Sequence, residues 1–300
     1  MKNTDKKMIE LGLETANRRL VYWDRIWSEY SNDKVNIGEK LALVLRTIIK
    51  AFPLHKDIRA LSIGSSNEPQ FRILETACRG GLYLLDIEKA ALDKVRERVK
   101  RQSISHVKTI QDDYKKCFFR DKDAKEFLLC QLAGVKVNLI ALHHSLYYCR
   151  EKNWYEIFRN LYRHILARKG AIHTVLMSAE AGSQNTTTWL YNHFAGKYFG
   201  LRNDQDLLTF QKELRADKYF RPAQIMATSS RVLFWADDFK KFMAVIWMIL
   251  LYPDVCPYSQ RQREEITEFV YKRLWQKRKP LVQKQDHMVI YRDIGFKGLI

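Results

Sequence analysis

The sequence has little of what marks disordered, extracellular or metal-binding chains. Its 300 residues include 6 prolines and 12 glycines, which leaves little room for long low-complexity tracts, and no internal repeat is visible. The 5 cysteines are odd in number, widely separated and never spaced as Cys-x-x-Cys. This pattern argues against both a disulfide framework and a zinc site.

Long apolar runs are also missing. The longest, residues 242–252, falls well short of the roughly 20 residues that span a bilayer. The first residues, Met-Lys-Asn-Thr-Asp-Lys-Lys, are not followed by an apolar stretch that could serve as a signal sequence. We therefore expect a cytoplasmic protein without a membrane partner.

Acidic residues are outnumbered by basic ones. The chain has 34 Asp and Glu against 52 Lys and Arg, a formal net charge of +18 that attracts polyanions. The densest basic cluster, residues 272–279, lies at the end of a predicted helical segment, where cations also suit the helix dipole. A solvated basic surface and a nucleic-acid footprint explain this charge equally well. Nucleic acid is left open as a partner, and the sequence does not indicate an oligomeric state.

What the sequence does contain is a regular alternation of apolar strands and amphipathic helices. Strands are predicted near residues 59–63, 82–86, 106–111, 136–142 and 171–177, and helices near 68–79, 88–101, 122–133, 152–167 and 186–198. Residues 8–50 show helical spacing ahead of the first strand. Such an alternation predicts an α/β fold whose parallel sheet is covered on both faces.

Polar residues and a glycine follow the predicted strands where each strand ends. The carboxyl ends carry Gly64, Ser65 and Ser66; Asp86 and Ile87; Asp112 and Asp113; and His143, His144, Tyr147 and Tyr148. A glycine lets the backbone turn tightly toward a ligand, and an acidic group about 20 residues later accepts the hydroxyls of a ribose. The glycine loop reads Gly-Ser-Ser-Asn-Glu-Pro instead of Gly-x-Gly-x-x-Gly, so a structural turn is an alternative. The strand-turn-helix context favours a nucleoside site.

The series of strands resembles the class I S-adenosylmethionine-dependent methyltransferases. The resemblance rests on Leu-Leu-Asp86-Ile-Glu-Lys-Ala-Ala-Leu, on residues 137–148 and the helix after them, and on Ile165-Leu-Ala-Arg-Lys-Gly170-Ala-Ile-His-Thr-Val-Leu. Residues 222–227 and 287–292 are similar to the sixth and the antiparallel seventh strand. The resemblance implies a Rossmann-like seven-stranded sheet, mostly parallel with the last strand antiparallel, and S-adenosylmethionine as cofactor. It also implies an N-terminal helical cap over residues 1–56 and a methyltransferase domain over 57–300, with a helical insertion at about 237–280.

Within that group the chain is most similar to the histamine N-methyltransferase family. The similarity rests on Leu61-Ser62-Ile63-Gly64, on residues 143–148, on Phe158-x-x-Leu161 and on the helical stretch 237–278. It implies cofactor contacts at Gly64, Asp86, Asp112 and the backbone around His143, and we expect Ser65, Ser66, Ile87 and Asp113, at the same strand ends, to contact the cofactor as well. The family's N-terminal substrate-binding carboxylate has no counterpart that we can align, and its C-terminal amide falls near Gln283 or Lys284. Histamine as the substrate does not follow.

The residue types after the fourth strand suit methyl transfer. A sulfonium methyl group needs an in-line nucleophile about 3 Å away, so a protein contributes positioning, exclusion of water and a base. We expect His144 and Tyr147 to be catalytic, and both to bind the substrate together with Tyr148, although the tyrosines could equally be wall packing. No nucleophile elbow, phosphate loop or metal-ligand cluster is visible, which disfavours a hydrolase or a kinase.

These observations predict a methyltransferase that acts on a small-molecule acceptor, an amine or imidazole nitrogen. Two alternatives stay open. The first is an RNA methyltransferase that uses the basic surface, and the second is an inactive binding protein of the same fold whose glycine loop has decayed.

Overall fold

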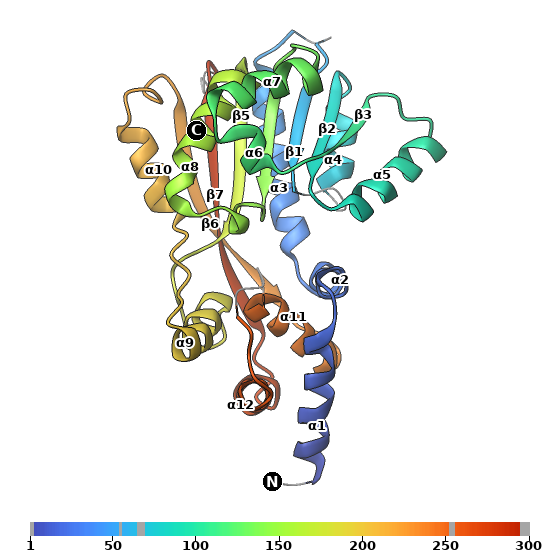
Figure 1. Cartoon of the computed structure of the whole chain (residues 1–300), viewed down its shortest axis with the longest axis vertical. Coiled ribbons are helices and arrows are strands. Elements are labelled where there is room, and N and C mark those ends of the chain that lie inside the picture. The colour runs from blue at the N-terminus through green and yellow to red at the C-terminus, as the bar shows by residue number, and fades with distance from the viewer. Residues whose placement is uncertain (1–2, 54–55, 65–69, 252–255, 295–300) are drawn as a thin grey trace. The chain divides into compact units, whose positions relative to one another are not determined.

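The computed structural model describes residues 3–53, 56–64, 70–251 and 256–294 (Figure 1). The chain divides into two compact units. The helical unit comprises Met1–Asn36, Met177–Asp204 and Ser229–Gln285, and the sheet unit comprises Ile37–Leu176, Gln205–Thr228 and Asp286–Ile300. The two units are defined by how the chain packs, and each combines segments that are far apart in the sequence. The predicted domain boundary at residue 56 stays a prediction.

Seven strands form one sheet, and their positions confirm the predicted strands. They are β1 (Arg59–Ile63), β2 (Gly81–Asp86), β3 (Val107–Gln111), β4 (Val137–His143), β5 (Leu166–Met177), β6 (Gln224–Phe234) and β7 (Leu281–Arg292). The strand order is β3-β2-β1-β4-β5-β7-β6. The four pairs from β3 to β5 are parallel. The sheet is mostly parallel with one antiparallel strand, β7, which lies between β5 and β6 (Figure 1). The predicted α/β, Rossmann-like class is confirmed.

Helices cover both faces of the sheet, which explains why the strands read as continuous apolar runs. One face packs against α3 (Asp33–Lys50), α4 (Gln70–Ala77) and α5 (Lys89–Arg101). The other packs against α6 (Tyr114–Phe118), α7 (Asp121–Leu132), α8 (Trp154–Asn160), the π-helical turn η4 (Leu161–Ile165) and α10 (Leu207–Ala216). Every residue of β4 is buried. Helix α10 was not expected from the sequence, although the Asp206 side chain accepts the amide hydrogen bonds that begin it.

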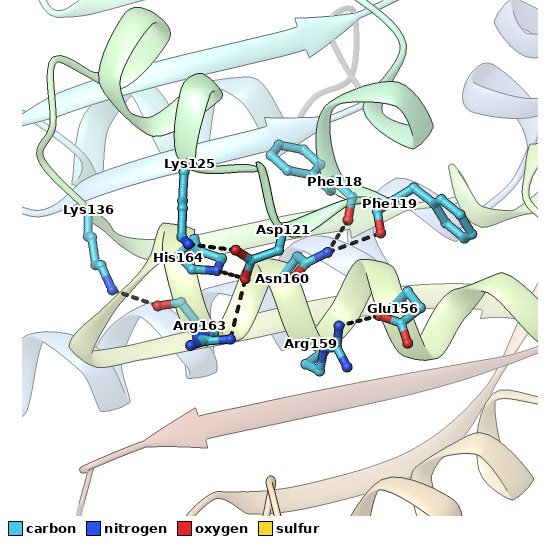
Figure 2. Close-up of polar contacts among 10 residues, drawn as sticks. All are labelled: Phe118, Phe119, Asp121, Lys125, Lys136, Glu156, Arg159, Asn160, Arg163 and His164. Carbon is cyan, nitrogen blue, oxygen red and sulfur yellow. Dashed lines mark hydrogen bonds and ion pairs between the residues drawn. The ribbon is translucent and has the colours of Figure 1, made fainter. Parts of the chain in front are cut away.

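A polar cluster ties the second helix layer together (Figure 2). The carboxylate of Asp121, at the start of α7, lies 2.6 Å from His164 Nε2 and 2.6 Å from Lys125 Nζ. The hydrogen bond with Lys125, followed by that with His164, lowers the pKa of Asp121 to about 2. The buried Asn160 Nδ2 donates to the carbonyl of Phe118. These contacts join η4 to α7 and α8 to α6, within the helix layer on one face of the sheet.

The helical unit has its own core of aromatic and aliphatic side chains. Its elements are α1 (Asn3–Leu13), the short helix η1 (Glu14–Asn17), α2 (Leu20–Tyr30), α9 (Thr187–Phe199), α11 (Phe239–Leu251), α12 (Gln260–Val270) and the π-helical turn η5 (Tyr271–Trp275). Buried tryptophans anchor it, because Trp23 Nε1 donates to the Thr15 carbonyl and Trp247 Nε1 donates to the Gly12 carbonyl. Among the described helices, α11 included, none is long and apolar enough to cross a membrane.

Candidate active site

The candidate site lies where the order of the strands reverses. Strand β1 pairs with β2 on one side and with β4 on the other. The chain therefore leaves β1 and β4 in opposite directions, and their loops separate at the carboxyl edge of the sheet. In open parallel sheets, ligands bind in the crevice at such a switch point. All of the predicted site residues that the structure describes belong to the loops or strand ends at this edge.

Gly64 makes the turn that ends β1. Its φ is +73°, a conformation that side chains with a Cβ rarely adopt, and its amide donates to the carbonyl of Leu85 at 2.8 Å. A Cβ at this position would lie 2.7 Å from Ser145 Cβ, closer than side chains approach. Glycine is thus required by both the backbone angle and the neighbouring loop after β4. The predicted cofactor contacts Ser65 and Ser66 lie outside the described residues.

The two acidic strand ends lie next to each other. Asp86 closes β2, is half-buried, and accepts a hydrogen bond from the Glu88 amide at 2.9 Å. The amide of Asp112 donates to the Asp86 carbonyl at 3.1 Å, which places the third strand end beside the second. Ile87 follows Asp86 with 65% of its side chain exposed. This edge therefore offers a carboxylate and an apolar side chain together.

Asp113 has a structural contact of its own. Its side chain accepts a hydrogen bond from the Lys115 amide at 3.0 Å and begins α6 as an N-cap. The next residue, Tyr114, donates its hydroxyl to the Ser145 carbonyl at 3.1 Å, a contact that joins the loop after β3 to the loop after β4. With the Gly64 and Asp112 contacts, all four loops are linked. These hydrogen bonds bring the ends of the four strands together, whereas the predicted role of each residue stays a prediction.

His144 and Tyr147 form a pair just beyond β4. His144 has a φ of +51° and its amide donates to the Val175 carbonyl at 2.9 Å. Its Nδ1 lies 2.9 Å from the Tyr147 hydroxyl, and the two rings are almost parallel. The contact with the tyrosine orients the imidazole, and the left-handed backbone is one that histidine adopts more readily than most residues. Tyr148 has 45% of its side chain exposed.

His143 belongs to a row of buried histidines that was not predicted from the sequence. Its Nε2 lies 3.1 Å from Nδ1 of His173 on β5, and the His173 ring stacks on His287 of β7 with centroids 5.8 Å apart. Burial, and then the charges of His143, His287 and Lys40, hold the pKa of His173 well below its usual range. His173 is therefore neutral at pH 7, so it can take part in a hydrogen bond with His143 without a charge. Periodicity alone gives no signal for this contact, since it depends on which strands pair.

The described side chains at this edge do not indicate a metal site. In the part of the chain that the structure describes, no group of three or more His, Cys, Asp or Glu side chains is arranged to hold a metal ion.

The sequence matches no family model and no curated protein. Similarity is found at the level of structure. The YcgJ protein of Bacillus subtilis has a TM-score of 0.51 and 11% identity over 85% of this chain and 100% of that one. A protein of Bacillus halodurans, described as a "putative methyltransferase", has a TM-score of 0.50 and 11% identity over 83% of this chain and 98% of that one. The chain shares their Rossmann-like fold. At this identity the likeness concerns the fold, and the function must be argued from the site.

The site in this Rossmann-like fold can bind a nucleoside and orient a nucleophile. The Gly64 turn brings backbone to the switch point, and the Asp86 carboxylate can accept two hydroxyl hydrogen bonds from a ribose. The loop after β4 adds an imidazole and a phenol in contact with each other. An imidazole and a phenol can accept and donate a proton, which is the chemistry that a nitrogen nucleophile needs.

Proposed function

We propose that the protein is an S-adenosylmethionine-dependent methyltransferase whose acceptor is a small molecule with an amine or imidazole nitrogen. The observation that carries the proposal is the position of Gly64 and Asp86. They end neighbouring strands at the switch point, and the Gly64 amide bonds to the residue before Asp86. A glycine turn beside a carboxylate at this place suits the nucleoside part of the cofactor.

Each predicted cofactor residue that the structure describes has a place in this proposal. The Gly64 backbone approaches the cofactor, Asp86 binds the ribose hydroxyls, and exposed Ile87 provides an apolar surface for the flat face of the base. Asp112 and the backbone of His143 border the same edge, and Asp113 holds the Asp112 loop through its cap on α6. When bound, S-adenosylmethionine supplies an electrophilic methyl group. We also propose that the protein is related to the histamine N-methyltransferase family and that it is cytoplasmic.

The acceptor is assigned to the loop after β4. A protonated amine has no lone pair for attack, so the site must keep the nitrogen deprotonated and aimed at the methyl group. We assign proton acceptance to His144, orientation of its ring to Tyr147, and a substrate wall to exposed Tyr148. The bond between His143 and His173 holds the strand end from which this loop leaves.

Two measurements on the purified chain test the proposal. Calorimetry should show binding of S-adenosylmethionine and of S-adenosylhomocysteine. Transfer of a labelled methyl group should then be seen with at least one member of a panel of small amines and imidazoles, and not with RNA. Absence of cofactor binding contradicts the proposal as a whole, binding without transfer to any acceptor favours the inactive binding protein, and transfer to RNA alone favours the RNA methyltransferase.

Replacing Gly64 by alanine should weaken cofactor binding and lower stability. The left-handed backbone costs about 1–2 kcal/mol for a residue with a Cβ, and the added methyl group would also collide with Ser145. Gly200→Ala is the matched control, because Gly200 has a φ of +69° with nothing within 4 Å of the added Cβ. Urea unfolding should show a loss in both variants, while calorimetry should show weaker cofactor binding in Gly64→Ala alone. Equal cofactor affinity in the two variants would remove Gly64 from the site.

A further inference from the structure

Two adjoining grooves lie at the amino edge of the sheet, at the other ends of the strands that carry the candidate site. The larger has a volume of about 920 Å³ and the smaller about 320 Å³. Both are bordered by Lys56, Asn138, Ala167 and Arg168. We call the two, which share these lining residues, the amino-edge groove. All of its lining residues belong to the sheet unit.

Cations predominate in the lining of this groove. They are Lys56, Arg59, Lys136, Arg168 and Lys169, and the carboxylates are Asp57 and Asp293. Arg168 is paired with Asp293 at 2.8 Å, but both side chains are largely exposed, so the pair is weak. The groove therefore keeps an excess of positive charge.

The other four cations have partners that do not neutralise them. Lys169 Nζ donates to the Ala51 carbonyl at 3.0 Å. Lys136 Nζ donates to the Arg163 carbonyl at 2.6 Å, a contact drawn in Figure 2. Lys56 lies over the ring of Phe52. Arg59 bonds to a tyrosine hydroxyl and a backbone carbonyl. Within the described residues, none of these four side chains forms an ion pair with a carboxylate.

A further cation, Arg292, lies close to Lys136 at the amino edge of the sheet. Burial, and then the charge of Arg292, lowers the pKa of Lys136. Arg292 is itself held by the carbonyls of Tyr162 and Leu166. A carbonyl partner holds a cation in place without supplying a neutralising negative charge, so the anchored side chain can still attract an anion.

Several cations that border two adjoining open hollows suit a chain of negative charges better than a single anion. A single phosphate group needs two or three converging cations, whereas the five here border two adjoining hollows. The net charge of +18 adds long-range attraction for a polyanion. We propose that the amino-edge groove binds the phosphate backbone of a single-stranded nucleic acid.

This proposal goes beyond methyl transfer and does not depend on it. The strands place the groove and the candidate site at opposite ends of the sheet, roughly 20 Å apart for strands of this length at about 3.3 Å per residue. A strand of nucleic acid held in the groove is thus not held as the methyl acceptor. The groove is a docking surface with a separate ligand.

Fluorescence anisotropy of a labelled 12-nucleotide RNA, titrated with the full chain at several salt concentrations, tests the proposal. The groove variant carries Lys56→Gln, Arg168→Gln and Lys169→Gln, three exposed side chains. The control variant carries Lys277→Gln, Arg278→Gln and Lys279→Gln, which removes the same charge from exposed positions in the helical unit. Calorimetry with S-adenosylmethionine should give the same affinity in the parent and both variants.

We expect the groove variant to bind at least tenfold more weakly than the parent at 50 mM salt. Its slope of log affinity against log salt should fall by about 2, since each lost phosphate contact to a single strand contributes about 0.7. The control variant should stay within about threefold of the parent. The proposal is overturned if the parent does not bind RNA at 50 mM salt or if both variants weaken equally. It is also overturned if a polyglutamate peptide of equal charge binds as tightly as RNA, because the groove then accepts any polyanion.

Discussion

Replacing His144 by glutamine is expected to lower turnover by about 10²–10⁴-fold, the usual contribution of a positioned base. The imidazole lies beyond β4, its Nδ1 is 2.9 Å from the Tyr147 hydroxyl, and its backbone is anchored to Val175. The expected loss is one of rate, because no predicted contact with the cofactor uses this side chain. Steady-state rates between pH 6 and 9, together with calorimetry of the cofactor, provide the measurement.

Two further variants separate the imidazole from the backbone and the ring. His144→Asn removes the imidazole but suits a φ of +51°, since asparagine tolerates left-handed backbone well. It should be as slow as His144→Gln. Tyr147→Phe keeps the stacked ring and loses the hydroxyl that orients His144, so it should cost less. Full turnover in both His144 variants, or a loss of cofactor binding by them, would show that His144 has a structural role and is not the base.

Replacing Asp86 by alanine is expected to weaken binding of S-adenosylmethionine at least tenfold. Each charge-assisted hydrogen bond to a ribose hydroxyl contributes about 1.5–3 kcal/mol, and 1.4 kcal/mol corresponds to a factor of ten. The carboxylate also accepts the Glu88 amide, a contact that steadies the turn after β2. Calorimetry at neutral pH measures the change directly.

The controls for Asp86 distinguish charge from local structure. Asp86→Asn keeps an oxygen for the Glu88 amide and removes the charge, so it should lose most of the affinity while unfolding at nearly the parent's urea concentration. Asp93→Ala removes an exposed carboxylate from α5 and should bind the cofactor like the parent. Undiminished binding by Asp86→Ala would refute the assignment of the ribose site.

The strands and the order of elements could be predicted because their signals are local. The sequence predicts β1 at the residues where it forms, and β2 to β4 within one residue, because each is a short, largely apolar or alternating segment bounded by turn residues. The predicted beginnings of β5 and β7, at residues 171 and 287, and the predicted end of β6, at residue 227, differ by several residues from the structure. Strand β5 begins at Leu166, ahead of the predicted residue 171, because its first residues pair with Val137 across a bulge. Pairing across a sheet leaves no mark in the local pattern.

The sequence by itself determined the list of candidate residues. The spacing of Gly64 and Asp86, and the polar segment after β4, follow from the positions of strand ends along the chain. The tertiary structure decided which of these residues meet. Ser145 excludes a Cβ at Gly64, although the two lie in loops far apart in the sequence. Asp113, which was predicted to contact the cofactor, caps the N-terminus of α6.

Only the tertiary structure revealed the histidine row and the amino-edge groove. His143 and His173 lie 30 residues apart, and they touch because β4 and β5 pair in one particular parallel register. The groove likewise collects cations from the loops before β1 and β4 and from the first residues of β1 and β5. The physical reason is the same in both cases. Periodicity encodes which face of an element is buried, whereas contacts between elements depend on strand order and register, which arise when the whole sheet packs.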